Sequence, residues 1–325
     1  MSVNAKLQQI IKEKNEEAVK TVAKPQAPTR STGASGVAMW WGLLRDAFNK
    51  WNVDKAPRLG AALSYYTVFS LVPLLVVIIA ITGLVFGAEA AQNAIMTQIE
   101  GMMGDKSAAA IREMLQIAQQ PSSGILASII AVGTLLVGAS GVFAQLQDAL
   151  NTVWGIEAKQ GGGIWALIKD RFLSFVAVLG TGFLLMVSLV VSAGLAAFGK
   201  FVSGWLPGPE ALLQVANFIV SFGIITALFA MIFKLLPDAK IAWRDVWVGA
   251  AITSLLFTIG KFAIGMYLGK SDVGSAYGAA GSLVILLVWV YYSSQILLYG
   301  AEFTAVYANQ YGSRIVAASD AMPAR

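Results

Sequence analysis

Long apolar runs separated by short polar connections make up most of this chain. Six runs reach the roughly 20 residues that an α-helix needs to cross the hydrocarbon core of a bilayer. They lie at residues 59–86, 123–153, 172–199, 212–236, 246–268 and 280–308. The pattern predicts an all-α, polytopic helical membrane protein whose six transmembrane helices form a domain over residues 59–310.

Two further stretches alternate apolar and polar residues at helical spacing. Residues 36–58 mix Trp, Leu and Phe with Arg and Lys, which is typical of an amphipathic helix lying in the membrane interface. Residues 88–121 predict two amphipathic helices interrupted near Gly104. We expect this external helical hairpin either to rest on the outer leaflet or to close over an external opening as a lid.

The two ends of the chain are polar. Residues 1–35 combine a charged stretch with one rich in Pro, Ser and Gly, a composition typical of disordered segments. Residues 311–325 form a short tail after the last apolar run. We expect both segments to lie in water on the same side of the membrane.

The composition supports a membrane location, and the distribution of basic residues predicts the orientation. Of the 325 residues, 57% are hydrophobic and 13% are charged, whereas about a quarter of a soluble domain is charged. Alternate polar segments, beginning with the N-terminal one, hold 18 Lys and Arg residues, and the segments between them hold four. Because Lys and Arg accumulate in cytoplasmic loops, both termini are predicted to be cytoplasmic.

The chain contains neither cysteine nor histidine. Disulfides, thiolate nucleophiles, Ser-His-Asp triads and metal sites with Cys or His ligands are therefore excluded. A metal-dependent nuclease needs clustered ligands in water, but the carboxylates here are scattered. We expect no enzymatic activity, no cofactor, no metal and no nucleic-acid partner, and we attribute the basic residues to topology and anionic lipids.

Polar residues form a stripe in the last apolar run. Tyr292, Gln295, Tyr299 and Glu302 recur at helical spacing, and Gln295 and Glu302 are separated by about two turns. Polar groups in a span are costly and usually face protein or water. Gln295 and Glu302 either bind neighbouring protein groups or line a cavity open to the cytoplasm, with Glu302 as a proton or cation site.

The second predicted span ends with a similar face. Gln145 and Asp148 lie three residues apart, and Gln147 and Asn151 form a second pair four residues apart. Asp148 falls close to the cytoplasmic end of this span. It either marks the point where the helix enters water or supplies a second carboxylate to the cavity that contains Glu302.

The first predicted span contributes Tyr66, Ser70 and Pro73 at helical spacing. Tyr66 and Ser70 extend the candidate polar path. Pro73 removes one backbone donor and can kink the helix, so we consider it as a hinge. Arg58, at the start of this span, is a candidate counter-ion for Asp148 or Glu302.

The outer half of the predicted membrane domain holds a candidate cationic site. Lys261 lies inside a span and Asn217 lies at a similar depth in another. The Lys261 side chain either reaches the outer interface along its apolar stem or meets an anionic substrate or lipid headgroup. The spacing of Gly265 and Gly269 predicts close packing of that span against a neighbour.

Three segments resemble a known family. They read RLGAALSYYTVFSLVPLLVVIIA, ALNTVWGIE and YGAAGSLVILLVWVYYSSQILLYGAEFTAVYA. In this order, and with their Tyr, Pro, Gly and Glu residues, they resemble the YihY/virulence factor BrkB family, often labelled ribonuclease BN. The resemblance covers residues 40–310 and implies a six-span bacterial inner-membrane protein, for which transport of a lipid or another solute is proposed without agreed catalytic residues.

Two functions follow from these observations. The polar stripes favour a transporter or translocase that moves a lipid or another solute, including an anionic one, through a path between helices. The charged N-terminal segment, together with the lack of a nucleotide or ion site, favours a scaffold or regulator of cell-envelope assembly. We expect membrane lipids as partners in either case, and other envelope proteins for a scaffold.

Overall fold

The computed structural model describes residues 36–118, 141–158, 210–270, 277, 280–317 and 321–323. The expected span 172–199, most of the span 123–153 and the N-terminal segment 1–35 lie outside these residues. The chain divides into two compact units, Met1–Trp41 and Gly42–Arg325. All contacts below belong to the second unit.

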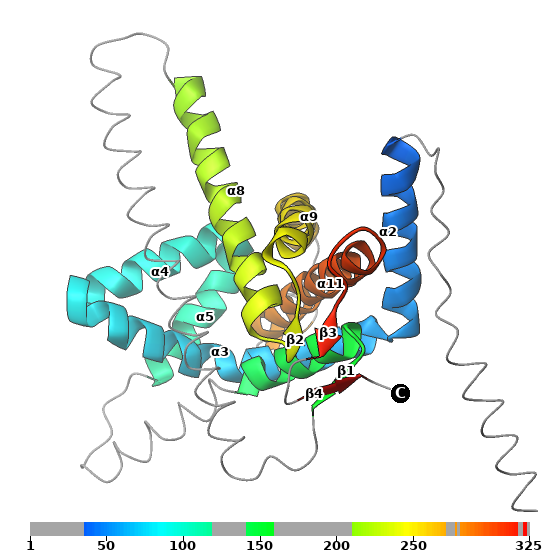
Figure 1. Cartoon of the computed structure of the whole chain (residues 1–325). Helices are drawn as coiled ribbons and strands as arrows, with labels where there is room; N and C mark the ends of the chain where they lie inside the picture. The colour runs from blue at the N-terminus through cyan, green and yellow to red at the C-terminus, as the bar shows by residue number, and fades with distance from the viewer. Residues whose placement is uncertain are drawn as a thin grey trace, which may run out of the picture. The chain divides into compact units, whose positions relative to one another are not determined.

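Four helices among the described residues are long and apolar enough to cross a membrane. They begin and end within three residues of the predicted spans, because hydropathy and helix length are local properties of the sequence. Helix α11 packs against both α3 and α9, and α8 packs against α9 (Figure 1). The four helices are α3 (Ala56–Phe86), α8 (Glu210–Leu235), α9 (Trp243–Lys270) and α11 (Gly281–Gln310).

Helices α9 and α11 approach closely through two reciprocal pairs of threonine and glycine. A Cβ atom built on Gly300 of α11 would lie 2.0 Å from Thr253 Oγ1 of α9, and one on Gly249 of α9 would lie 1.8 Å from Thr304 Oγ1 of α11. Each threonine therefore fills the space that the opposite glycine leaves. By contrast, none of the described residues lies within 4 Å of a Cβ on Gly265, so the close packing predicted there does not involve α3, α8 or α11.

Helix α2 (Gly36–Val53) precedes α3 and is separated from it by a single turn. Lys55 in this turn adopts the left-handed conformation, with φ of 53°, which is uncommon for a residue other than glycine, Asn or Asp. Pro57 then lies in the first turn of α3, where its missing N–H costs no helical hydrogen bond. The turn allows α2 and α3 to run in different directions.

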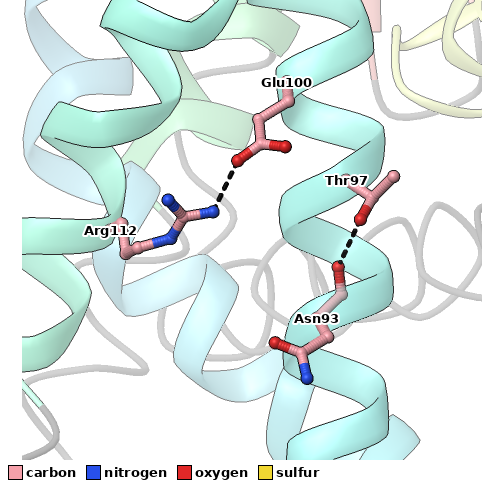
Figure 2. Close-up of polar contacts among 4 residues, drawn as sticks. All are labelled: Asn93, Thr97, Glu100 and Arg112. Carbon is pink, nitrogen blue, oxygen red and sulfur yellow. Dashed lines mark hydrogen bonds and ion pairs between the residues drawn. The ribbon is translucent and has the colours of Figure 1, made fainter.

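The connection after α3 consists of helices α4 (Ala88–Met103) and α5 (Asp105–Ala118). Gly104 separates them with a φ of 78°. Figure 2 shows the ion pair between Glu100 of α4 and Arg112 of α5. The apolar face of α5, including Ile111 and Leu115, is buried, and α5 packs against α3, α4 and α11. The predicted amphipathic faces therefore contact protein.

Within the described ranges, four short strands join the ends of the helices, a feature that the all-α prediction did not include. Strand β1 (Ile156–Ala158) pairs antiparallel with β4 (Ala321–Pro323). Strand β2 (Ala239–Lys240) pairs antiparallel with β3 (Val316–Ala317). The C-terminal tail thus contacts the segments that follow the helix at 141–153 and α8. These three segments were predicted to share one side of the membrane, and the pairing places them together (Figure 1).

Asp245 at the start of α9 attaches the tail to the helices. Its buried carboxylate accepts hydrogen bonds from the backbone N–H and the hydroxyl of Ser313, both at 2.7 Å. We expect Asp245→Ala to lower the stability of the purified protein by about 1–3 kcal/mol, because it removes a buried charged acceptor of two hydrogen bonds that hold the tail. Thermal unfolding in detergent measures the change, and Arg244→Ala, at an exposed neighbouring position, is the control. Equal melting temperatures for the two variants would contradict this role.

Candidate functional site

The candidate site lies on one face of α11, where two polar side chains are buried without partners. Glu302 has 0% of its surface exposed. Among the described residues, neither carboxyl oxygen of Glu302 has a hydrogen-bond partner, and the same holds for both amide atoms of Gln295. The two residues are about 10 Å apart along the helix axis, at 1.5 Å per residue. Each unpaired group is costly in an apolar environment.

Gln295 lies against the start of α3 at a glycine. A Cβ atom on Gly60 would be 2.0 Å from Gln295 Nε2, so only glycine leaves room for the amide. Two nearby hydroxyls are engaged elsewhere. Ser64 donates to the Gly60 carbonyl and Ser294 donates to the Val290 carbonyl, each at 2.8 Å. The Gln295 amide therefore faces a polar neighbourhood whose donors are already used by the backbone.

The face of α11 beside Glu302 packs against the middle of α2. Leu43 and Ala47 of α2 form a buried cluster with Phe303 and Val306 of α11. Such i and i+4 positions lie on one face of a helix, so this face of α2 is directed at α11.

Polar contacts between α2 and α11 flank this cluster on both sides. The Tyr299 hydroxyl donates to the Leu44 carbonyl at 2.9 Å. Further along, Gln310 donates to the Asp46 carboxylate at 3.0 Å. These contacts cover Glu302 from the side on which α2 lies.

Two charged side chains at the end of α2 are close enough to Glu302 to act electrostatically on its carboxyl group. They are Asp54 and Lys50, of opposite sign. A third group, the indole N–H of Trp51, is buried and has no acceptor among the described residues. By contrast, the buried indole of Trp154 donates to the Ala301 carbonyl at 3.3 Å, immediately before Glu302. The site therefore combines the Glu302 carboxyl with one acidic and one basic side chain at the end of α2.

Tyr66 and Ser70 of α3 meet the helix at 141–153. Ser70 is buried, and a Cβ on Gly141 would lie 3.4 Å from its hydroxyl and 3.8 Å from Tyr66 Cδ1. Pro73 lies inside α3, which continues to Phe86. The structure thus brings two predicted path residues together at this contact, and the helix does not end at Pro73.

Asp148 lies in a different environment from Glu302. It is exposed, whereas Gln145 one turn earlier is half-buried. The opposite pair on this helix makes the contacts: Gln147 and Asn151 both donate to the Asp238 carboxylate, Asn151 at 2.9 Å. This second face attaches the helix at 141–153 to the turn after α8.

Of the remaining predicted site residues, Tyr292 lies on α11 and the others lie on different helices. Lys261 is half-buried, and its ammonium is 5.2 Å from the ring centroid of Phe262. Asn217 lies on α8. Arg58 is exposed and forms no ion pair with Asp148 or Glu302 within the described part of the chain. Tyr292 is half-buried, and its hydroxyl is 3.2 Å from a Cβ built on Gly260.

No group of three or more His, Cys, Asp or Glu residues within the described ranges is placed to hold a metal ion. The arrangement can instead exchange a proton or accept hydrogen bonds. Sequence reasoning missed Gly60, which contacts Gln295, Asp54, which acts electrostatically on Glu302, and the buried indole of Trp51. A glycine one turn before Ser64 at the entry of a span was a signal for the first. Residues 36–58 offered no signal for the other two, because their partners lie far along the chain.

Comparison with known proteins places the chain among membrane proteins. The family model described as virulence factor BrkB matches residues 47–325. A UPF0761 membrane protein of Pseudomonas aeruginosa strain LESB58 is 27% identical over 252 residues, which are 76% of this chain and 58% of the relative.

Two further relatives carry the same description. One from Teredinibacter turnerae is 25% identical over 285 residues, 85% of this chain and 63% of its own length. One from Actinobacillus pleuropneumoniae is 27% identical over 263 residues, 78% of this chain and 89% of its own length. The chain thus spans less than two thirds of the length of the Pseudomonas and Teredinibacter relatives. No solved structure matches it.

Proposed function

Because this chain belongs to the virulence factor BrkB family of membrane proteins, we propose that it is a transporter or translocase. It moves a lipid or another solute, including an anionic one, along a polar path between helices. It does so in the bacterial inner membrane, with both termini in the cytoplasm, and without a chemical reaction on the solute. The family and relative names carry no activity, so the support comes from the molecule.

The observation that carries the proposal is the pair of unpartnered polar residues on α11. Glu302 and the amide atoms of Gln295 are buried, and a buried polar group without a hydrogen bond costs about 1–3 kcal/mol, an isolated charge more. A purely structural role would give each of them a protein partner. Groups left unsatisfied in one conformation are consistent with binding a solute, water or an ion in another.

Residues of α2, α3 and α11 line the proposed path. Gly60 admits the Gln295 amide between α3 and α11. The end of α2 provides Lys50 and Asp54, which can attract a charged headgroup towards Glu302. The Tyr66–Ser70 contact with Gly141 adds hydroxyl groups on the other side of α3. A solute with an anionic and a cationic part suits such mixed charges.

Transport in proteoliposomes tests the proposal. We expect purified protein to move fluorescent phospholipid between leaflets, read by a membrane-impermeant quencher, and we expect Glu302→Gln to lower the rate at least tenfold because the amide cannot change its charge. Asp148→Asn is the matched control, since Asp148 is exposed. Both variants must elute as the unaltered protein does.

A wild-type rate for Glu302→Gln would contradict a path at this face of α11. No lipid movement by inserted, folded protein would favour a soluble solute or the scaffold function. Removing residues 1–35 separates these two outcomes. A scaffold that docks through that segment loses its envelope partner, whereas a transporter keeps its rate.

A further inference from the structure

We propose that Glu302 is a proton-binding site, closed by α2, in which the carboxyl group is held in its neutral form beside Asp54. The carboxyl group is fully buried and neither oxygen has a hydrogen-bond partner among the described residues. The next residue, Phe303, packs with Leu43 and Ala47 of α2 in an apolar cluster, so α2 and α11 meet beside Glu302 through apolar side chains. An ionised carboxylate in such surroundings loses its hydration without replacement, whereas a protonated one does not.

A proton fits this site better than a metal ion does. Sodium and calcium ions take several oxygen ligands, six to eight in the case of calcium. Within the described residues, no three acidic side chains gather around any point. Asp54 is the acidic side chain among them that acts electrostatically on Glu302. A single proton on Glu302 needs no further ligand, and the negative charge of the nearby Asp54 disfavours a second negative charge there.

The charged and titratable groups on each packed element agree with a single proton at Glu302. From α2, Asp54 disfavours a second negative charge and Lys50 partly offsets it. On α11 itself, the Tyr299 hydroxyl is already used as a donor to Leu44. Arg58 at the start of α3 is exposed. On α9, Asp245 is bound by Ser313.

Helix α2 controls access to this proton. It contacts α11 on both sides of Glu302, at Tyr299 and at Gln310, and buries the adjoining Phe303. It is joined to α3 at Lys55, whose left-handed backbone marks a turn that can take up a change of direction. When α2 moves away, Glu302 gives its proton to water, the O–H bond breaks and the carboxylate charge is hydrated. Reclosure requires that a proton be taken up again. That this cycle drives solute movement rests on the proposed function, whereas the bound proton does not.

Infrared spectroscopy of the purified full chain tests the site directly. At neutral pH, we expect a C=O stretching band of a protonated carboxylic acid that is lost in Glu302→Gln and retained in Asp148→Asn. Asp54→Asn is a second variant, which leaves Glu302 intact and should shift the band by changing its neighbour. The spectra are recorded with and without sodium, and the band should persist in sodium because a proton rather than sodium occupies the site.

A second measurement separates the site from its role in transport. In proteoliposomes, a proton gradient should change the rate of the unaltered protein and leave Glu302→Gln unaffected. Identical carboxylic acid bands in the unaltered protein and Glu302→Gln, or a band removed by sodium, would overturn the proton site. A Glu302 band without any transport would support the site and reject the proposed function, whereas transport without the band would do the reverse.

Discussion

Gly300→Ala should destabilise the protein by about 1–3 kcal/mol, the usual cost of overpacking a core. The new Cβ would lie 2.0 Å from Thr253 Oγ1 and 2.7 Å from Thr253 Cγ2, and Thr253 is fully buried. The result runs against the local preference, because alanine is favoured over glycine inside a helix by about 1 kcal/mol. Thermal unfolding in detergent, followed by helical circular dichroism, measures the effect.

Two further variants show whether the contact between α9 and α11 is responsible. Gly265→Ala, in the same kind of helix but with nothing within 4 Å of the new atom, should leave stability unchanged or raise it slightly. Thr253→Ala combined with Gly300→Ala should recover part of the loss, because two of the clashing atoms are removed. A loss of equal size at Gly265, or no recovery in the double variant, would show that the two helices do not interlock here.

Joining α2 to α11 should stop transport almost completely. The natural chain has no cysteine, so cysteines placed at two positions are the only thiols. Asp46 and Gln310 are exposed and their side chains are in hydrogen-bond contact at 3.0 Å, which makes Asp46→Cys with Gln310→Cys a suitable pair. A short bifunctional reagent that forms a disulfide with each thiol should abolish transport, and a reducing agent should restore it.

This result is expected because α2 covers Glu302 and must move to expose it. The matched controls are the two single-cysteine variants, which react with the reagent but cannot be joined. A cross-linked protein that transports at the rate of its unreacted form would show that α2 stays in place during the cycle. Loss of transport in the single variants as well would instead show that modification of either position disturbs the path.

The positions of the transmembrane helices could be predicted from local hydropathy. Four of the predicted spans agree with α3, α8, α9 and α11, because apolar length alone determines which segments fit a bilayer. The distribution of basic residues grouped the segments after residue 153, after α8 and at the C-terminus on one side. The pairing of β1 with β4 and of β2 with β3 brings those same segments together, although the sequence contained no sign of the strands.

Contacts between distant segments were not predictable in this way. The glycine spacing at Gly265 was a valid local signal for close packing, but the glycines that α9 and α11 use are Gly249 and Gly300, each opposite a threonine. Spacing along one helix says which residues share a face. Which face meets a neighbour depends on the other helix.

The candidate site likewise has features that the sequence predicts and features that depend on tertiary contacts. The helical period by itself determined that Gln295 and Glu302 share one face of the last helix. Only the tertiary structure decided that Gly60 contacts Gln295, that α2 covers Glu302 and that Asp148 is exposed. The physical reason is that backbone hydrogen bonding sets the period of a helix within a few residues, whereas burial depends on residues far away in the sequence. Leu44, whose carbonyl accepts a hydrogen bond from Tyr299, lies 255 positions from it.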